Sequence, residues 1–132
     1  MTEPVKITPL HEIGKDDRGS TATFSLPRTQ SQFISIFRRA GSISGNTYHE
    51  GKNPGTNPKI FVLLQGTIHF SYRHKDEPNA QEITLANPSV IEITPFVTHQ
   101  VEALSDILIL ECNSIDDIQK DRCKLAVTSS QR

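Results

Sequence analysis

Short segments in which apolar and polar residues alternate recur along most of the chain. Residues 67–74 are the cleanest example, because Ile68, Phe70 and Tyr72 share one face of a strand and polar residues share the other. The segments are rich in β-branched and aromatic residues and are separated by Gly, Pro, Asn and Asp. They cover residues 21–26, 33–39, 46–50, 60–64, 67–74, 82–85, 89–94, 100–103 and 107–112. This pattern predicts an all-β barrel or sandwich.

Two details of strand arrangement follow from the same pattern. The dipeptide Gln65-Gly66 separates residues 60–64 from residues 67–74, and we expect these two strands to form a hairpin. Residues 1–15 contain short apolar pieces interrupted by two prolines, which favours an N-terminal arm or an edge strand.

The C-terminal end has a different character. Ser114 and Asp117 have the spacing of a capping box, so we expect a short helix over residues 114–124. Residues 128–132 are expected to be a frayed tail. The chain shows no linker, internal repeat or low-complexity segment, and residues 1–132 are therefore expected to form a single domain.

Charge and composition exclude several classes of partner. Lys and Arg together number 14 against 15 for Asp and Glu, a balance that favours neither nucleic acid nor an anionic membrane. No apolar run approaches the roughly 20 residues that span a bilayer, and the N-terminus lacks the apolar core of a signal peptide. The two cysteines, Cys112 and Cys123, have no metal or redox spacing. We expect a cytoplasmic protein with reduced cysteines.

The candidate chemistry gathers around residues 41–66. Thr47 and His49 lie two apart on an expected strand and so share a face. A polar pair inside an apolar sheet indicates the lining of a cavity, although two ordinary hydrogen-bonded side chains would give the same pattern. His99 follows Pro95 close to another expected strand, and it is the second imidazole that such a cavity could receive.

These residues resemble the motifs of the cupin superfamily. The first cupin motif places a glycine, a His-x-His pair, an acidic residue and a second glycine in order, and the second motif places a histidine after a proline. The corresponding residues here are Gly41, Thr47-Tyr48-His49, Lys59, Gly66, Pro95 and His99. The resemblance extends from about residue 16 to residue 122, and it implies a double-stranded β-helix, a small jelly roll with the site in its mouth.

Within the cupins, the chain resembles the branch that acts on sugar nucleotides. Residues 45–51, GNTYHEG, are similar to the Gly-Asn-His-Tyr-His segment of the cupin domain of capsular polysaccharide epimerases. Residues 17–20, DRGS, resemble the Asp-x-Arg-Gly turn of dTDP-sugar 3,4-ketoisomerases and dTDP-4-dehydrorhamnose 3,5-epimerase. Lys59 is similar to a lysine kept before an apolar strand in these epimerases. The resemblance implies an isomerase or epimerase of polysaccharide or deoxysugar biosynthesis.

The match departs from the metal-binding cupins at two positions. Thr47 replaces one motif histidine and Lys59 replaces the carboxylate, which leaves two imidazoles beside an ammonium that repels cations. Fewer than three good donors rarely hold a metal tightly. We therefore expect no native metal and no cofactor, with His49 and His99 as the fallback ligands of a weakly held metal.

Epimerisation or ketoisomerisation of a 4-keto sugar requires a base, a group that stabilises the enolate, and exclusion of water. We expect His49 to be the base and Lys59 to stabilise the enolate oxygen or to bind a phosphate. His99 is the expected acid, with Tyr72 as the alternative if it faces inward. Thr47 is a departure here too, because in the epimerases the histidine at its position is the one credited with catalysis.

The remaining candidate residues would bind the substrate. Arg18, in the Asp-Arg-Gly turn, is expected to hold a nucleotide diphosphate by resemblance, and Arg38 has the guanidinium fork that suits phosphate oxygens. Asn46, Thr47 and Tyr72 complete the expected binding set.

Two other functions remain open. The chain could be a cupin that binds a small polar ligand without turnover, which the loss of the histidine at Thr47 favours, or a metal cupin with unusual ligands. The expected partners are a nucleotide sugar or similar metabolite and a second copy of the chain. In this homodimer, residues 5–13 could supply an exchanged edge strand.

Overall fold

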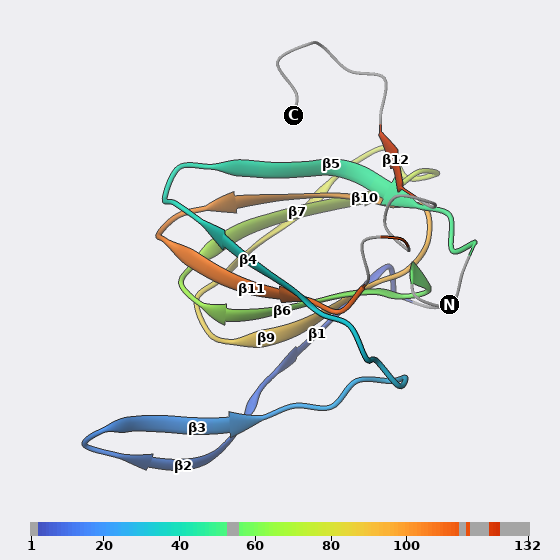
Figure 1. The fold of residues 1–132 in the computed structure, drawn as a ribbon. Coiled ribbons are helices and arrows are strands. Elements are labelled where there is room, and N and C mark those ends of the chain that lie inside the picture. The colour runs from blue at the N-terminus through green and yellow to red at the C-terminus, as the bar shows by residue number, and fades with distance from the viewer. Residues whose placement is uncertain (1–2, 53–55, 114–115, 117–121, 125–132) are drawn as a thin grey trace.

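The computed structural model describes residues 3–52, 56–113, 116 and 122–124, and these residues contain twelve strands. Ten of the strands form two five-stranded antiparallel sheets that face each other (Figure 1). The first sheet contains, in spatial order, β1 (Val5–Pro9), β9 (Ser89–Ile93), β6 (Lys59–Gln65), β11 (Ile107–Glu111) and β4 (Ile34–Arg38). The second contains β12 (Arg122–Lys124), β5 (Ile43–His49), β10 (Val97–Ala103), β7 (Ile68–His74) and β8 (Gln81–Leu85).

The all-β prediction is confirmed for the described residues. Spatial order differs strongly from chain order in both sheets, as expected for strands that cross repeatedly between the two layers of a roll. No helix in the described part of the chain has the length and apolar character needed to cross a membrane.

The main core lies between the two sheets. Alternate residues of β1, β6, β7, β9, β10 and β11 point inward and are almost completely buried, as alternation on a pleated strand requires. They are Val5, Phe61, Leu63, Ile68, Phe70, Ile91, Ile93, Val97, Val101, Ala103, Ile107 and Ile109.

The apolar run of β6 is buried on both faces. Phe61 and Leu63 point into the main core, while Ile60 and Val62 join a second cluster on the other side of the sheet. Leu10, Phe24 and Leu26 pack against this second cluster from the segments that flank β2 and β3. A strand covered on both faces needs a continuous rather than an alternating apolar sequence, which explains residues 60–64.

The hairpin predicted for residues 60–64 and 67–74 is wrong. These residues form β6 and β7, which belong to different sheets, because both edges of β6 are already paired, one with β9 and one with β11. The turn at Gly66, whose φ is +96°, instead carries the chain from one sheet to the other. A Cβ on this residue would collide with the Asp106 carbonyl, so both the conformation and the space favour glycine.

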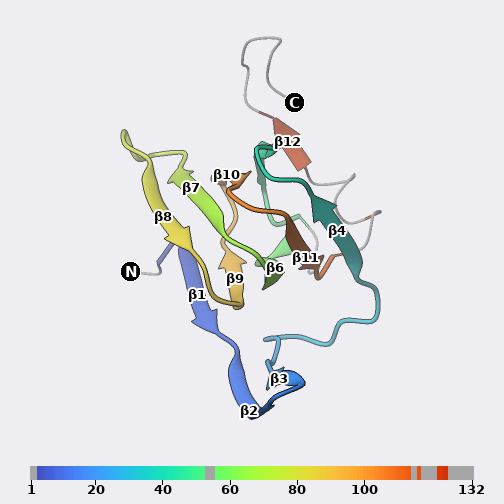
Figure 2. The same ribbon diagram turned by 90° about the vertical axis from the view of Figure 1, so that its left-hand side faces the viewer.

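The N-terminal residues do two different things. Val5–Pro9 form β1 and pair with β9 of the same chain, so the expected edge strand is present. β2 (His11–Asp16) and β3 (Gly19–Thr23) then pair with each other as a separate two-stranded hairpin whose residues are all exposed. Figures 1 and 2 both show this hairpin projecting away from the two sheets.

The short helix expected over residues 114–124 falls mainly outside the described residues. Where its end is described, Arg122–Lys124 form β12, a strand that pairs with β5, so the helix does not extend to residue 124. The expected tail, residues 128–132, also lies outside the described part of the chain.

Candidate active site

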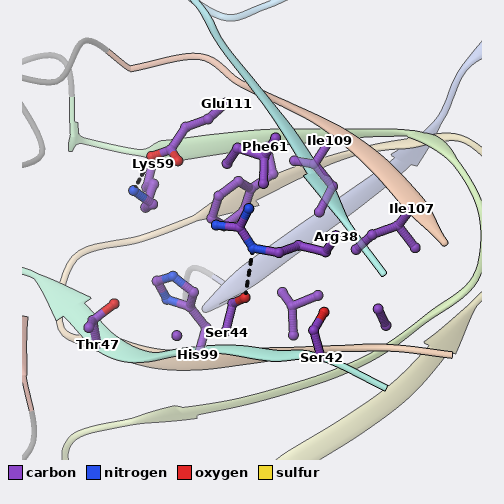
Figure 3. Close-up of a pocket in the computed structure, with 14 residues that line it drawn as sticks. Arg38, Ser42, Ser44, Thr47, Lys59, Phe61, His99, Ile107, Ile109 and Glu111 are labelled. Atoms are coloured by element: carbon purple, nitrogen blue, oxygen red, sulfur yellow. Dashed lines mark hydrogen bonds and ion pairs between the residues drawn. The ribbon is translucent and has the colours of Figure 1, made fainter. Parts of the chain in front are cut away.

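A cavity of about 410 Å³ lies between the two sheets and runs along the strand direction. Its lining comes from five strands, β4, β5, β6, β10 and β11, and from the turn that joins β4 to β5. The lining residues are Ile36, Arg38, Ser42, Ser44, Gly45, Thr47, Lys59, Phe61, His99, Val101, Ala103, Ile107, Ile109 and Glu111. Figure 3 shows Lys59, Glu111 and Thr47 at one end of the cavity and Arg38 and Ser42 at the other.

We call Thr47, Lys59, His99 and Glu111 the inner end, and Arg38, Ser42 and Ser44 the mouth. All four inner-end residues are at most 8% exposed, whereas Arg38 is exposed and the two serines are half-buried. Apart from Gly45, the other lining residues are aliphatic or aromatic. The cavity therefore has a buried polar group at one place and a solvent-exposed polar group at another, and the rest of its wall is largely apolar.

A buried ion pair dominates the inner end. The Lys59 ammonium is bonded to the Glu111 carboxylate, and both side chains are less than 10% exposed. Lys59 Nζ also lies 3.5 Å from His49 Nε2 and 5.2 Å from the centre of the Phe61 ring. Since the carboxylate neutralises the ammonium, both charges can remain buried.

The two histidines predicted to converge are close in space. The rings of His49 and His99 are nearly parallel, with centroids 6.3 Å apart, and His99 meets Phe61 edge to face at 5.7 Å. His99 Nδ1 lies 3.3 Å from the Val97 carbonyl oxygen, which accepts from it, so Nε2 is the ring's acceptor nitrogen. Burial, together with the nearby Lys59 charge, lowers the pKa of His99 to about 3, and the ring is therefore neutral near pH 7.

Strand alternation explains how Lys59 and Glu111 meet. Lys59 precedes Phe61 and Leu63 on the inward face of β6, and Glu111 follows Ile107 and Ile109 on the inward face of β11. β6 and β11 are neighbours in the first sheet, so the two charged ends of their inward rows come together.

Arg28 ties the ends of these two strands together. Its guanidinium donates to the carbonyl of Pro58, the residue before Lys59, and to the carbonyl of Cys112, the residue after Glu111. Arg28 lies in the segment that leads from β3 to β4 and is partly buried at these contacts. A guanidinium with several donors in one plane is suited to such a bridge between two backbone carbonyls.

A β-bulge in β5 sets which of its residues face the cavity. The pairing of β10 with β5 shifts between His99 and Gln100, so that Gly45 and Asn46 together face a single residue. Both have positive φ angles, +112° and +66°. A Cβ on Gly45 would lie 2.6 Å from the His99 carbonyl oxygen, so no larger residue fits there. Because of the extra residue, Ser44 and Thr47 both line the cavity.

At the mouth, Arg38 reaches from one sheet toward the other. Its Nε lies 3.4 Å from Ser44 Oγ, and its Nη1 donates to the Phe37 carbonyl at 2.9 Å. In Figure 3 the guanidinium lies over the cavity, between β4 and the ribbon that carries Ser44. Among the described residues, no carboxylate forms an ion pair with Arg38.

The structure brings some of the sequence-predicted residues together and separates others. His49, Lys59 and His99 converge between the sheets, and Thr47 and Arg38 line the same cavity. His49 contacts Lys59 but is not among the described residues that line the cavity. The remaining three substrate-binding candidates, Arg18, Asn46 and Tyr72, do not line it either.

Arg18 lies far from the other two, whereas Asn46 and Tyr72 border the same small groove. Arg18 sits in the turn between β2 and β3, paired with Asp16, and its side chain is 87% exposed. Asn46 borders this groove together with Tyr72 and His99. Tyr72 does face inward, but it packs on Phe70 at 5.6 Å outside the cavity lining.

Sequence reasoning missed Glu111, Arg28 and the two mouth serines. A signal for Glu111 was available, because alternation along residues 107–111 places Ile107, Ile109 and Glu111 on one face. A carboxylate continuing an apolar row indicates a buried partner, and Lys59 is that partner. Arg28 offered no comparable signal, since its partners are backbone carbonyls.

No group of three or more His, Cys, Asp or Glu side chains that could hold a metal is present in the described residues. The contacts of Lys59 at the inner end give a chemical reason for the absence of such a group. Lys59 Nζ contacts both His49 and Glu111, so an ammonium holds the donors that would otherwise face a cation.

No known family model matches the sequence, and no curated protein sequence matches it. Solved structures do. The sugar 3,4-ketoisomerase QdtA from Thermoanaerobacterium thermosaccharolyticum, in complex with TDP, superposes with a TM-score of 0.72 and 16% identity over 96% of this chain and 91% of that one. The dTDP-4-dehydrorhamnose 3,5-epimerase from Sulfolobus tokodaii gives a TM-score of 0.70 and 19% identity over 98% and 80%.

The chain has an RmlC-like cupin fold.

A third solved structure matches this chain over part of its own length. The capsular polysaccharide assembling protein CapF from Staphylococcus aureus is 25% identical, with a TM-score of 0.60, over 90% of this chain and 35% of that one. The present chain therefore corresponds to about a third of CapF. The fold expected from residues 41–66 and 95–99 is confirmed. The match to sugar-nucleotide ketoisomerases and epimerases confirms the general resemblance that these residues indicated.

Proposed function

We propose that the cavity binds a nucleotide-linked 4-keto sugar and that the protein moves a proton beside the sugar ketone, as an epimerase or a ketoisomerase. One observation carries this proposal: an ammonium, a carboxylate and a neutral imidazole converge at the closed end of a cavity of about 410 Å³. That volume falls within the range of ordinary small-molecule sites. Solved structures that share the fold include a 3,4-ketoisomerase in complex with TDP-4-keto-6-deoxyglucose and a dTDP-4-dehydrorhamnose 3,5-epimerase.

The proposed chemistry keeps the inner end electrically balanced. A carboxylate at Glu111 takes the proton from the carbon next to the ketone and becomes neutral, while the electron pair moves onto the ketone oxygen. The Lys59 ammonium, which balanced the carboxylate, then balances the enolate oxygen. In an epimerisation, a proton then returns to the opposite face of the same carbon and the ketone re-forms. In a ketoisomerisation, the proton returns to the former carbonyl carbon, and the neighbouring hydroxyl passes its proton to the former ketone oxygen as the new ketone forms. Because water is excluded, both interactions are stronger than they would be in solvent.

This assignment differs from the one expected from the sequence, in which His49 is the base. His49 contacts Lys59 and does not line the cavity, so we propose that it helps to orient the ammonium. His99, whose pKa is lowered to about 3, is a weak base and is better suited to donating or accepting a hydrogen bond as a neutral ring.

Solvent exchange tests the function directly. The protein is mixed with dTDP- and UDP-4-keto sugars in D₂O, and deuterium at the carbons beside the ketone is followed by NMR and mass spectrometry. We expect exchange with at least one sugar, and its absence with all of them would remove the enzymatic proposal. Glu111→Gln should reduce exchange by roughly 10²-fold or more, the usual size of a general-base contribution. A larger loss of deuterium exchange in His49→Asn than in Glu111→Gln would instead identify His49 as the base.

A second function is favoured by one residue. Thr47 stands where the related epimerases use a histidine, and a hydroxyl cannot replace an imidazole as a base at neutral pH. A cupin that binds a nucleotide sugar without turnover would show thermal stabilisation by dTDP or UDP and no exchange. If the Thr47→His variant then exchanged deuterium, the absence of a histidine at position 47 would be identified as the cause of the missing activity.

We also propose that a second copy of the chain covers the β2–β3 hairpin. A two-stranded hairpin alone is at best marginally stable in water, and this one exposes all of its residues, including Ile13 at 62%. Arg18, in its turn, could reach a cavity only in another copy, where it would contribute to diphosphate binding. Ile13→Asp should convert a dimer to a monomer in light scattering, whereas Glu77→Lys, a change at an exposed residue outside the hairpin, should not. A wild-type monomer would refute this assembly.

A further inference from the structure

The charged groups of the cavity are unevenly distributed. Of the described residues that line it, the charged ones are Arg38, Lys59 and Glu111. Lys59 and Glu111 neutralise each other at the inner end, and Arg38 lies at the mouth without an ion pair in the described part of the chain. The inner end therefore has no net charge, while the mouth is positive.

Because the inner end is buried, its neutrality affects which ligand groups can bind there. Lys59 and Glu111 are 4% and 6% exposed, so solvent does not screen a charge brought next to them. A ligand carboxylate or phosphate placed there would lose its hydration and would meet Glu111 as well as Lys59. A neutral carbonyl or hydroxyl loses far less hydration and can accept a hydrogen bond from the ammonium.

We propose that Glu111 is a specificity-determining residue, because it neutralises Lys59 and so restricts the inner end to neutral carbonyl or hydroxyl groups. An anionic group on the same ligand is excluded from the inner end and remains at the mouth, beside Arg38 and the two serines. The ligand thus enters with its neutral polar end first. This inference rests on the cavity being the ligand site of the proposed function, but it does not require turnover.

A lysine without the carboxylate would behave in the opposite way. It would leave an unbalanced buried cation, and small anions would bind there. Whether the inner end prefers a neutral or an anionic ligand group therefore distinguishes a specificity role for Glu111 from a purely structural ion pair. A structural pair that does not select the ligand would leave the preference unchanged when the carboxylate is removed.

The first test compares two probes of similar size, dihydroxyacetone, which is a neutral ketone, and pyruvate, which carries a carboxylate. Binding is followed by the NMR signals of the His99 ring, which lines the inner end. We expect wild-type protein to bind dihydroxyacetone at least tenfold more tightly than pyruvate, and Glu111→Gln to reverse this order. Glu102→Gln, a change at a partly exposed glutamate of β10, should retain the wild-type order. An unchanged order in Glu111→Gln would overturn the proposal, as would equal binding of the two probes by the wild type.

A second test remains valid if Glu111→Gln folds poorly. Glu111→Ala leaves space for a small carboxylate, so acetate should raise its melting temperature by several degrees more than chloride at equal ionic strength. Wild-type protein should show no such difference, because its own carboxylate occupies the place. The double variant Lys59→Met/Glu111→Ala has no cation to pair and should not respond to acetate. Equal acetate effects in all three proteins would refute the role of Glu111.

These outcomes are independent of the exchange experiment on keto sugars. A protein without exchange but with the expected reversal of probe preference would refute the enzymatic proposal and retain the specificity role. A protein with exchange but no reversal would do the opposite.

Discussion

The two ends of the cavity hold their charges in different ways. At the inner end, Lys59 is buried and balanced by Glu111, with His49 and Phe61 packed around the ammonium. At the mouth, Arg38 is exposed, and its contacts with other described residues are a long one to Ser44 and a hydrogen bond to the neighbouring Phe37 carbonyl. A buried charge is coupled to the stability of the fold, whereas an exposed charge can be exchanged with little structural effect. The inner end should therefore respond to substitution as part of the core, and the mouth as part of a binding surface.

The largest expected effect comes from removing one member of the buried pair. Glu111→Leu leaves the Lys59 ammonium buried without a counter-charge, and the free energy of unfolding should fall by about 3–5 kcal/mol. The double variant Lys59→Met/Glu111→Leu removes both charges and should recover most of that loss. Urea unfolding followed by circular dichroism measures both. A single variant as stable as the wild type would show that the inner end is not dry.

The pH dependence of stability gives the next largest effect. The unfolded chain binds a proton at His99 with the ordinary pKa of 6.5, whereas the folded chain does so only near pH 3. Between these values the unfolded state holds more protons, so stability falls as the pH is lowered from 6.5 toward 3. The slope approaches about 1.4 kcal/mol per pH unit for this residue alone.

His99→Gln removes the titrating group and should flatten this part of the curve, while His11→Gln, an exposed control, should not. Unfolding measured in urea at a series of pH values between 4 and 7 provides the comparison. If His99→Gln and the wild type keep the same slope, the ring is more accessible to protons than its burial indicates.

A smaller effect on stability is expected from Arg28, which ties the ends of β6 and β11 together. Arg28→Met should lower the free energy of unfolding by about 1–3 kcal/mol, because two partly buried carbonyls lose a charged donor. Arg73→Met is a matched control, since Arg73 also donates to a backbone carbonyl, that of Glu77, but at an exposed position. Equal losses of unfolding free energy in the two variants would mean that the contacts of Arg28 with β6 and β11 stabilise the fold no more than an exposed contact does.

The smallest effect on stability, and a clear effect on binding, is expected at the mouth. Arg38→Gln should change the free energy of unfolding by less than about 0.5 kcal/mol, the usual range for surface positions. The same change should weaken dTDP binding by roughly tenfold, the loss of one charge-assisted contact. Arg39→Gln is the control, because Arg39 adjoins Arg38 but does not line the cavity. Calorimetry that shows equal losses for both arginines would separate Arg38 from ligand binding.

The sequence contained enough information to predict the inner end in part. The convergence of His49, Lys59 and His99 followed from strand alternation combined with the order of two motifs. Glu111 required one more step, the recognition that it extends an inward apolar row. The interaction of Arg28 with two carbonyls could not be predicted, because any backbone can accept such bonds and only the tertiary fold decides which carbonyls are near.

The error in the fold prediction has a similar origin. Residues 60–64 and 67–74 have the local features of a hairpin, two strands with a short Gly-containing turn between them. Local sequence does not record that β9 and β11 occupy both edges of β6. The continuous apolar run of β6 was the available sign, since a strand buried on both faces is more often central than at an edge.

The bulge at Gly45 and Asn46 has a consequence for how such a pocket can change over time. The extra residue breaks the alternation of the strand. The number of residues in the bulge therefore decides whether the side chains before it face the same way as those after it. Loss of either residue would rotate Ser42 and Ser44 toward solvent while Thr47 and His49 kept their direction. A single-codon deletion could thus rebuild the entrance of this pocket and leave its chemistry intact.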